Sequence, residues 1–116
     1  MDIRKFFRSF IYAFQGIVAA TKEQNMRFHL ASACIVTIAG LLTGLTTLEW
    51  LVIVLVIVLV IGAEMINSAI ERVVDLATAE IHPLAKAAKD IAAGAVLVFA
   101  IGSVIIGVLI FFPKWF

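Results

Sequence analysis

The chain has 116 residues, of which 64% are hydrophobic and 15% are charged, and its mean hydropathy is +1.15. A soluble domain of this size could not bury so much apolar surface, which excludes a soluble enzyme and indicates one integral membrane domain. The formal net charge of +1 gives no sign of nucleic-acid binding, and we expect no nucleic-acid partner. The single cysteine, Cys34, excludes an intramolecular disulfide.

The N-terminal segment, residues 1–27, predicts an amphipathic helix that lies in the membrane interface. Its phenylalanine and aliphatic residues recur at helical spacings, interspersed with Asp2, Arg4, Lys5 and Arg8. The segment does not resemble a cleaved signal peptide, because it lacks an uninterrupted apolar run followed by a small-residue cleavage site.

Three apolar segments are each long enough to cross a bilayer, which requires about 20 apolar residues. They cover residues 28–45, 48–68 and 91–112. The third is predicted to end at Pro113, with Lys114 and Trp115 as interfacial anchors. We therefore expect an all-α integral membrane protein with three transmembrane helices after the interfacial one.

Two connections join the spans. Between the first and the second, Thr46 followed by Glu49 three residues later predicts a capping box at a helix N-terminus. The second connection, residues 76–90, is polar and contains His82 and Pro83. Because proline suits the first turn of a helix, we expect a helix to run from about Pro83 into the third span.

Small residues at helical spacing predict close packing between helices. Gly40 and Gly44 form a GxxxG pattern, and the third helix carries a stripe of alanines at Ala85, Ala88, Ala92 and Ala95. Since three helices form a thin bundle with little interior, we also expect the protein to oligomerise.

The basic residues predict the orientation in the membrane. Of the nine Lys and Arg residues, all but Lys114 lie before the first span or between the second and the third. Positively charged segments stay on the cytoplasmic side, so the N-terminus and the 76–90 connection are expected in the cytoplasm and the C-terminus outside.

A polar stripe follows the most apolar run of the chain, Trp50 to Ala63. At about 100° per residue, Glu64, Asn67, Glu71 and Asp75 fall within an arc of about 80° on one face of a helix. A carboxylate in hydrocarbon costs roughly 2.5–3.5 kcal/mol, so such a stripe indicates a functional site.

Carboxylate and amide oxygens are ligands that suit Mg²⁺. The sequence contains neither GxxxxGK(S/T) nor GxGxxG, the glycine-rich motifs that commonly hold phosphates. Phosphoryl transfer needs a metal, a cation and a base. Glu64 is the deepest acid and the natural base for a lipid hydroxyl, Glu71 is better placed for a metal, and Lys89 could meet phosphates with Asp90 orienting it. Structural roles stay open for several residues, namely solvation by Asp75, a turn at His82, and membrane anchoring by Lys86 and Lys89.

Two sequence blocks resemble the prokaryotic diacylglycerol kinase family. The first is Glu64-Met-Ile-Asn67-Ser-Ala-Ile-Glu71-Arg-Val-Val-Asp75, and the second begins at His82-Pro-Leu-Ala-Lys-Ala-Ala-Lys89-Asp90. The second block and the ending Phe111-Phe-Pro-Lys are most similar to the branch that phosphorylates undecaprenol. The resemblance covers nearly the whole chain.

The resemblance implies a set of roles and a homotrimer with active sites between subunits. Glu64 would be the general base with Asn67 in the same site, and Glu23 and Glu71 would bind the Mg²⁺ that accompanies ATP. The nucleotide site would be lined by Tyr12, Glu80, Ile81, His82, Lys89 and Asp90, together with a basic residue that is either Arg4 or Lys5.

The sequence thus predicts a kinase in the bacterial cytoplasmic membrane that uses ATP and Mg²⁺ to phosphorylate undecaprenol. One alternative makes diacylglycerol the lipid acceptor, since both lipids present a hydroxyl at the interface. A second is a small proton-coupled transporter, although transporters place their buried acid near the midplane of the membrane. A third is a membrane scaffold without enzymatic activity.

Overall fold

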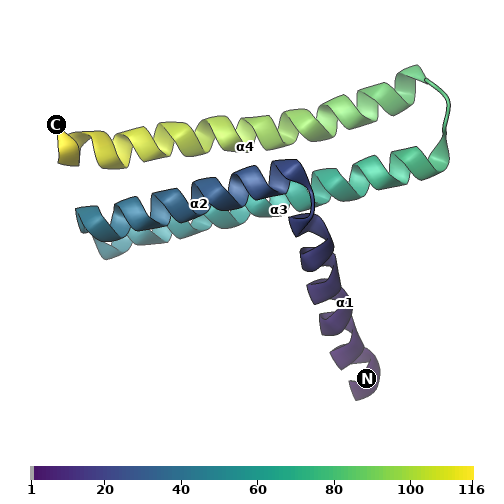
Figure 1. The fold of residues 1–116 in the computed structure, drawn as a ribbon, viewed down its shortest axis with the longest axis horizontal. Helices are drawn as coiled ribbons and strands as arrows, with labels where there is room; N and C mark the ends of the chain where they lie inside the picture. Colours follow the sequence, from purple (N-terminus) through teal and green to yellow (C-terminus); the bar gives the residue numbers. More distant parts are fainter. Residues whose placement is uncertain (1) are drawn as a thin grey trace.

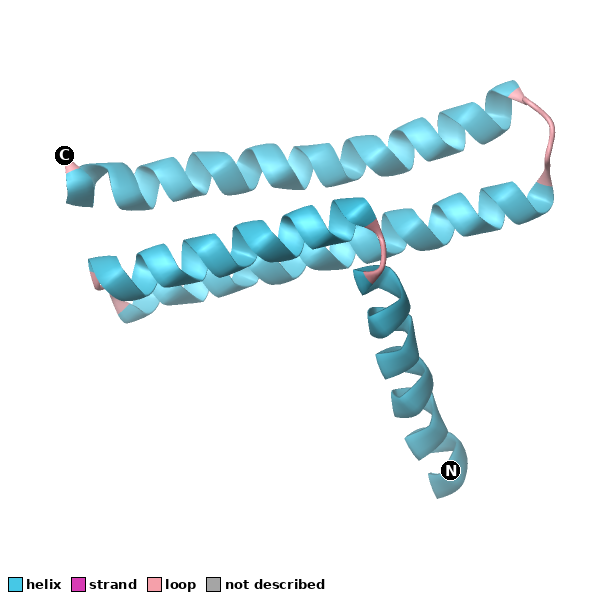
Figure 2. Ribbon diagram, viewed as in Figure 1, coloured by secondary structure: helices cyan, strands magenta, loops and turns pink. Residues whose placement is uncertain are grey.

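The computed structural model describes residues 2–116 as four α-helices joined by short connections (Figure 2). The helices are α1 (Ile3–Thr21), α2 (Gln24–Thr43), α3 (Thr47–Ala77) and α4 (Pro83–Trp115). Of these, α2, α3 and α4 are long and apolar enough to cross a membrane. The prediction of an all-α protein with three candidate membrane spans is therefore confirmed.

The three long helices run lengthwise beside one another, and α1 leaves this bundle at a steep angle (Figure 1). The 20 residues of α2 span about 30 Å, which matches the hydrocarbon core of a bilayer. The 31 residues of α3 and the 33 of α4 span roughly 46–50 Å, so both helices extend well beyond the start of α2. Their projecting ends are joined by residues 78–82.

The helices extend beyond the apolar runs from which the spans were predicted. Helix α2 begins at Gln24 rather than near residue 28, and α3 continues past residue 68 to Ala77. Hydropathy marks the lipid-facing part of a helix, whereas backbone hydrogen bonds continue through its polar turns. Helix α4 likewise continues through Pro113 to Trp115, beyond the apolar run of the third predicted span.

The turn between α2 and α3 has the predicted capping box. The Thr46 side chain accepts from the Glu49 backbone N–H at 3.2 Å, and the Glu49 carboxylate accepts from the Thr46 N–H at 2.9 Å. Within the GxxxG pattern, only Gly40 packs closely, since a Cβ there would lie 2.7 Å from the Trp50 ring. Gly44 instead ends α2 in the left-handed conformation with φ 79°, where a residue without a Cβ avoids strain.

The C-terminus of α4 is attached to this turn. Lys114 forms an ion pair with Glu49 at 3.0 Å, and the Trp115 indole N–H donates to the Thr43 hydroxyl at 2.9 Å. These contacts fasten the C-terminal end of α4 to the α2–α3 turn at one end of the bundle, opposite the end that carries the α3–α4 connection.

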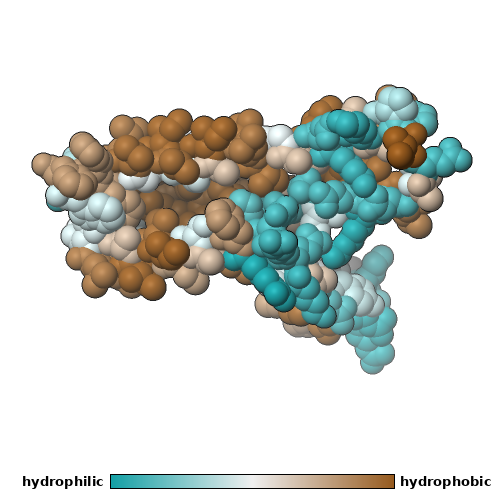
Figure 3. Space-filling model, turned by 45° about the horizontal axis from the view of Figure 1, so that its top comes forward, coloured by the Kyte–Doolittle hydropathy of each residue, from teal (hydrophilic) through white to brown (hydrophobic). Residues whose placement is uncertain are grey.

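Polar and apolar surface separate along the bundle, as Figure 3 shows. Hydrophilic residues gather at the end that carries the α3–α4 connection and over α1, while the rest of the bundle surface is hydrophobic. Large apolar side chains such as Leu42, Leu109 and Ile35 are mostly exposed. A surface of this kind is stable only when lipid or another protein chain covers it.

Candidate active site

Three polar side chains are buried in the described part of the chain, and all three lie on α3. Glu64, Asn67 and Ser68 are only 2%, 4% and 3% exposed, respectively. Further along the same helix Glu71 is half-buried and Asp75 is exposed. The stripe predicted from helical spacing therefore passes from a buried end at Glu64 to a solvent-exposed end at Asp75.

The amide of Asn67 is only partly satisfied. Its Nδ2 donates to Glu71 Oε1 at 3.4 Å, a long hydrogen bond. Its Oδ1 is buried and has no hydrogen-bond partner within residues 2–116. A buried acceptor without a partner is costly to the fold, so a donor from outside the described chain would be stabilising at this oxygen.

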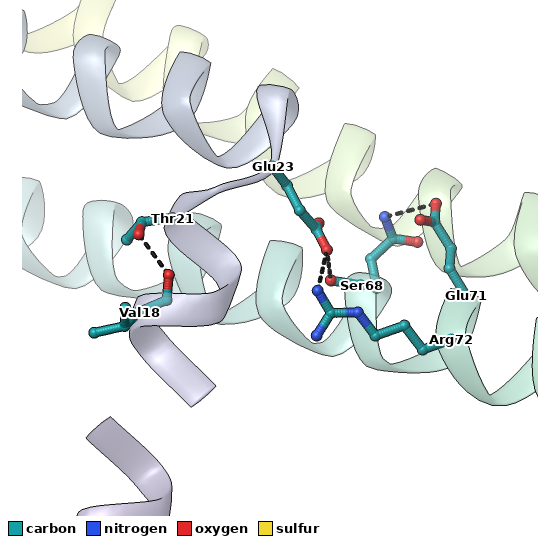
Figure 4. A network of polar contacts seen from close by, with 7 residues as sticks. Val18, Thr21, Glu23, Ser68, Glu71 and Arg72 are labelled. Carbon is teal, nitrogen blue, oxygen red and sulfur yellow. Dashed lines mark hydrogen bonds and ion pairs between the residues drawn. The ribbon is translucent and has the colours of Figure 1, made fainter. Parts of the chain in front are cut away.

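Glu23 reaches the stripe from the turn between α1 and α2. Its carboxylate accepts hydrogen bonds from the Ser68 hydroxyl and from Arg72, the latter at 3.0 Å (Figure 4). Ser68, which bonds Glu23, and Asn67, which bonds Glu71, each lie about one turn along α3 from Glu64. The fold thus gathers three carboxylates from two segments that are far apart in the sequence.

His29 of α2 contacts the deepest of these acids. Its Nε2 lies 3.5 Å from Glu64 Oε2, and the two side chains are 13% and 3% exposed. His29 also lines an apolar groove of about 560 Å³ between α2, α3 and α4. Sequence reasoning did not single out His29, because a lone histidine in a different helix gives no periodic signal.

Lys89 and Asp90 lie in the first turns of α4, but their pairing differs from the expectation. Lys89 forms an ion pair with Asp75 across the α3–α4 contact, whereas Asp90 pairs with Lys86 at 2.5 Å. The expected orienting role of Asp90 toward Lys89 is therefore wrong, because Asp90 lies one helical turn from Lys86 and is bonded to it. Asp75, which had no assigned chemistry, is the residue that contacts Lys89.

Several other predicted residues lie away from this cluster within the single chain. Lys5 and Tyr12 are exposed on α1, which projects away from the bundle (Figure 1). Glu80, Ile81 and His82 are exposed in the connection between α3 and α4. His82 Nδ1 accepts from the Leu84 N–H at 3.1 Å and thereby caps α4, so its turn role is confirmed.

No group of three or more His, Cys, Asp or Glu side chains in residues 2–116 is arranged to hold a metal ion. The two acids predicted to bind Mg²⁺, Glu23 and Glu71, each use Oε1 for the bonds described above. Mg²⁺ commonly takes one or two protein carboxylates and completes its shell with phosphates and water. The carboxylates of Glu23 and Glu71 are therefore a fitting donor set for it.

Comparisons with known proteins agree with the two sequence blocks. Residues 11–111 match the family described as prokaryotic diacylglycerol kinase. An undecaprenol kinase of Bacillus subtilis is 53% identical over 114 residues, which cover 97% of this chain and 93% of that protein.

Relatives named diacylglycerol kinase are more distant. One from Synechocystis sp. is 41% identical over 90% of this chain and 61% of its own length. One from Helicobacter pylori is 39% identical over 82% of this chain and 75% of its own length. With three membrane-spanning helices and a matching family model over most of its length, the chain belongs to the prokaryotic diacylglycerol kinase family and is a multi-pass membrane lipid kinase.

Proposed function

We propose that this kinase transfers the γ-phosphoryl group of ATP to the hydroxyl of undecaprenol. The observation that carries the choice of acceptor is the 53% identity to the undecaprenol kinase of Bacillus subtilis over nearly the full length of both chains. Diacylglycerol is the second candidate, because the relatives named diacylglycerol kinase include one at 41% identity. Membership of a kinase family leaves the transporter and scaffold alternatives without support.

Glu64 is the proposed general base. It is the most deeply buried acid of the stripe and lies about 26 Å along α3 from Thr47, close to the thickness of the hydrocarbon core. A hydroxyl on a lipid that is held at the interface can therefore reach it. Glu64 would accept the hydroxyl proton as the oxygen attacks the γ-phosphorus, and Asn67 would bond a reacting group through its unpaired Oδ1.

Glu23 and Glu71 are the proposed ligands of Mg²⁺. Each carboxylate keeps one oxygen free of the hydrogen bonds described above. When bound with ATP, Mg²⁺ would neutralise negative charge on the β- and γ-phosphate oxygens. Ser68 and Arg72 would hold Glu23 in position for this role.

Lys89 is the proposed phosphate-binding cation, with Asp75 fixing its position. The other nucleotide contacts are proposed for Glu80, Ile81, His82 and Asp90 in the α3–α4 region, and for Tyr12 and Lys5 or Arg4 on α1. Because α1 projects away from its own bundle, we propose that a homotrimer completes each site with residues of a neighbouring subunit.

The proposed membrane placement puts this site in the cytoplasm. Of the nine Lys and Arg residues only Lys114 is at the end of the bundle that carries Glu49, which supports a cytoplasmic N-terminus. Helix α1 would lie along the membrane surface, since it is amphipathic and leaves the bundle steeply. The projecting ends of α3 and α4 would then extend into the cytoplasm, where ATP is available.

Direct competition between the two lipids tests the acceptor. Purified protein would receive undecaprenol and diacylglycerol in the same micelles with labelled ATP, and the two phosphorylated products would be separated and counted. We expect undecaprenol to be phosphorylated with the higher kcat/KM. A preference for diacylglycerol would contradict the proposed acceptor and leave the assignment as a lipid kinase intact.

A further inference from the structure

The proposed base has a proton to dispose of in every turnover. Once Glu64 has taken the proton of the acceptor hydroxyl, it must lose that proton before it can act again. Its side chain is only 3% exposed, and it lies next to an apolar region of the bundle. Bulk water therefore does not reach the carboxylate freely, and a nearby proton acceptor is needed.

His29 is the titratable base in contact with Glu64. The two residues come from α2 and α3, and 3.5 Å separates His29 Nε2 from Glu64 Oε2. The imidazole is 13% exposed and the carboxylate 3%, so His29 is the less buried member of the pair. Imidazole is also the side chain whose unperturbed proton affinity lies nearest neutral pH, which suits it to receive and release a proton.

The surroundings of the pair restrict where the proton can go. Glu23 and Glu71 are the other acids of the cluster, and both are engaged through Oε1 with Ser68, Arg72 or Asn67. The Phe28 ring meets the imidazole edge-on, with 5.8 Å between the ring centroids, and both residues line the apolar groove. His29 thus lies at the boundary between the carboxylate cluster and the apolar groove.

We propose that His29 positions the Glu64 carboxylate and takes up the proton that Glu64 removes from the lipid hydroxyl. This inference rests on the proposed function of Glu64 as general base. The hydroxyl O–H bond breaks as its oxygen bonds to the γ-phosphorus, the bond from that phosphorus to the bridging oxygen of ATP breaks with its electron pair going to ADP, and the proton forms an O–H bond on Glu64. That O–H bond then breaks as an N–H bond forms at His29 Nε2, and the imidazolium releases the proton to water while ADP leaves.

Two variants separate positioning from proton uptake. His29→Gln keeps a side chain that can hydrogen-bond to Glu64 but cannot take up a proton. His29→Ala removes both functions and leaves space that free imidazole can enter. The matched control is Ser32→Ala, one turn away on the same helix, because the Ser32 hydroxyl donates only to Phe28 O of its own helix at 2.9 Å.

The expected results concern kcat at saturating ATP and undecaprenol. We expect kcat to fall at least about tenfold in both His29 variants, with KM for either substrate changed by less than about twofold. Added imidazole should restore a large part of the kcat of His29→Ala and should leave Ser32→Ala unchanged. The control for folding is a cooperative thermal unfolding transition of each purified variant in detergent.

Full turnover in His29→Gln would overturn the proposal. So would a loss in His29→Ala that imidazole does not reverse, because it would assign His29 a purely structural role. Glu64→Gln, measured in parallel, distinguishes a failure of the role of His29 from a failure of the role of Glu64. If Glu64→Gln is inactive while the His29 variants remain fully active, only the role of His29 is wrong; if Glu64→Gln is active, the proposed base itself is wrong.

Discussion

Glu23 and Ser68 are joined by a hydrogen bond between side chains that lie 45 residues apart in the sequence. Ser68 is buried on α3, and Glu23 precedes α2, so this bond attaches the start of the first long helix to the centre of the carboxylate cluster. Arg72 adds an ion pair to Glu23 on the more exposed side. The position of one proposed Mg²⁺ ligand therefore depends on two residues of another helix.

Replacing Ser68 should weaken the response to Mg²⁺. Hydrogen bonds to charged groups contribute about 1.5–3 kcal/mol, and 1.4 kcal/mol corresponds to a factor of about ten. We expect Ser68→Ala to raise the half-saturating Mg²⁺ concentration about tenfold while turnover at saturating Mg²⁺ is largely kept. The control is Ser103→Ala, whose hydroxyl donates to its own helix at Ala100. An unchanged Mg²⁺ titration for Ser68→Ala would contradict the positioning of Glu23 as a metal ligand.

The pairing of Lys89 with Asp75 predicts a non-additive double variant. If Asp75 acts only by holding Lys89, then Lys89→Ala should raise the KM for ATP about tenfold or more and Asp75→Asn should raise it less. The double variant should match Lys89→Ala alone. Lys114→Ala, at the opposite end of α4, serves as the control for loss of a basic residue. Additive effects would indicate that Asp75 has a contact of its own with the substrates.

Asn67 should show opposite effects on stability and on activity. Its buried Oδ1 lacks a partner in the described chain, and an unsatisfied buried acceptor costs about 1–3 kcal/mol. Asn67→Leu should therefore unfold, without ligands, at a temperature no lower than the parent protein, while kinase turnover falls by at least about a hundredfold. A marked drop in thermal stability would mean that this oxygen is already bonded within the folded protein.

The turn after α2 predicts a stability effect that is separate from catalysis. Gly44 has φ 79°, and a non-glycine residue in this conformation costs roughly 1–2 kcal/mol. Gly44→Ala should therefore lower the free energy of unfolding by about 1 kcal/mol, with turnover per folded molecule unchanged. Gly102→Ala is the matched control, since Gly102 is helical and has open space around its Cβ position. Equal effects for both glycines would contradict the role assigned to the left-handed turn.

The fold was largely predictable from the sequence because apolar run length and capping chemistry are local signals. The three long helices, the capping box at Thr46 and the helix start at Pro83 all follow from residues close together in the chain. The extents of the helices were not predictable from hydropathy, since α3 continues to Ala77 through polar residues that lie beyond the apolar run. Helix α4 in the same way includes Pro113 and Lys114, which lie beyond the apolar run of the third span.

The candidate site was predictable only where its residues share one helix. Helical spacing alone placed Glu64, Asn67 and Glu71 together on α3. Contacts between helices have no such spacing, so the His29–Glu64 contact appeared only in the structure. The partner of Lys89 was misjudged because Asp90 is adjacent in sequence, whereas the packing of α3 on α4 brings Asp75 to it.

The central claim is that Glu64 is the base in phosphoryl transfer to a lipid hydroxyl, and Glu64→Gln tests it most directly. Turnover would be measured with saturating ATP, Mg²⁺ and undecaprenol, beside Glu49→Gln as a control from the opposite end of the same helix. We predict that Glu64→Gln remains folded and loses about 10²- to 10⁴-fold in kcat, whereas Glu49→Gln keeps its turnover. A folded Glu64→Gln protein with turnover within about tenfold of the parent would contradict the account.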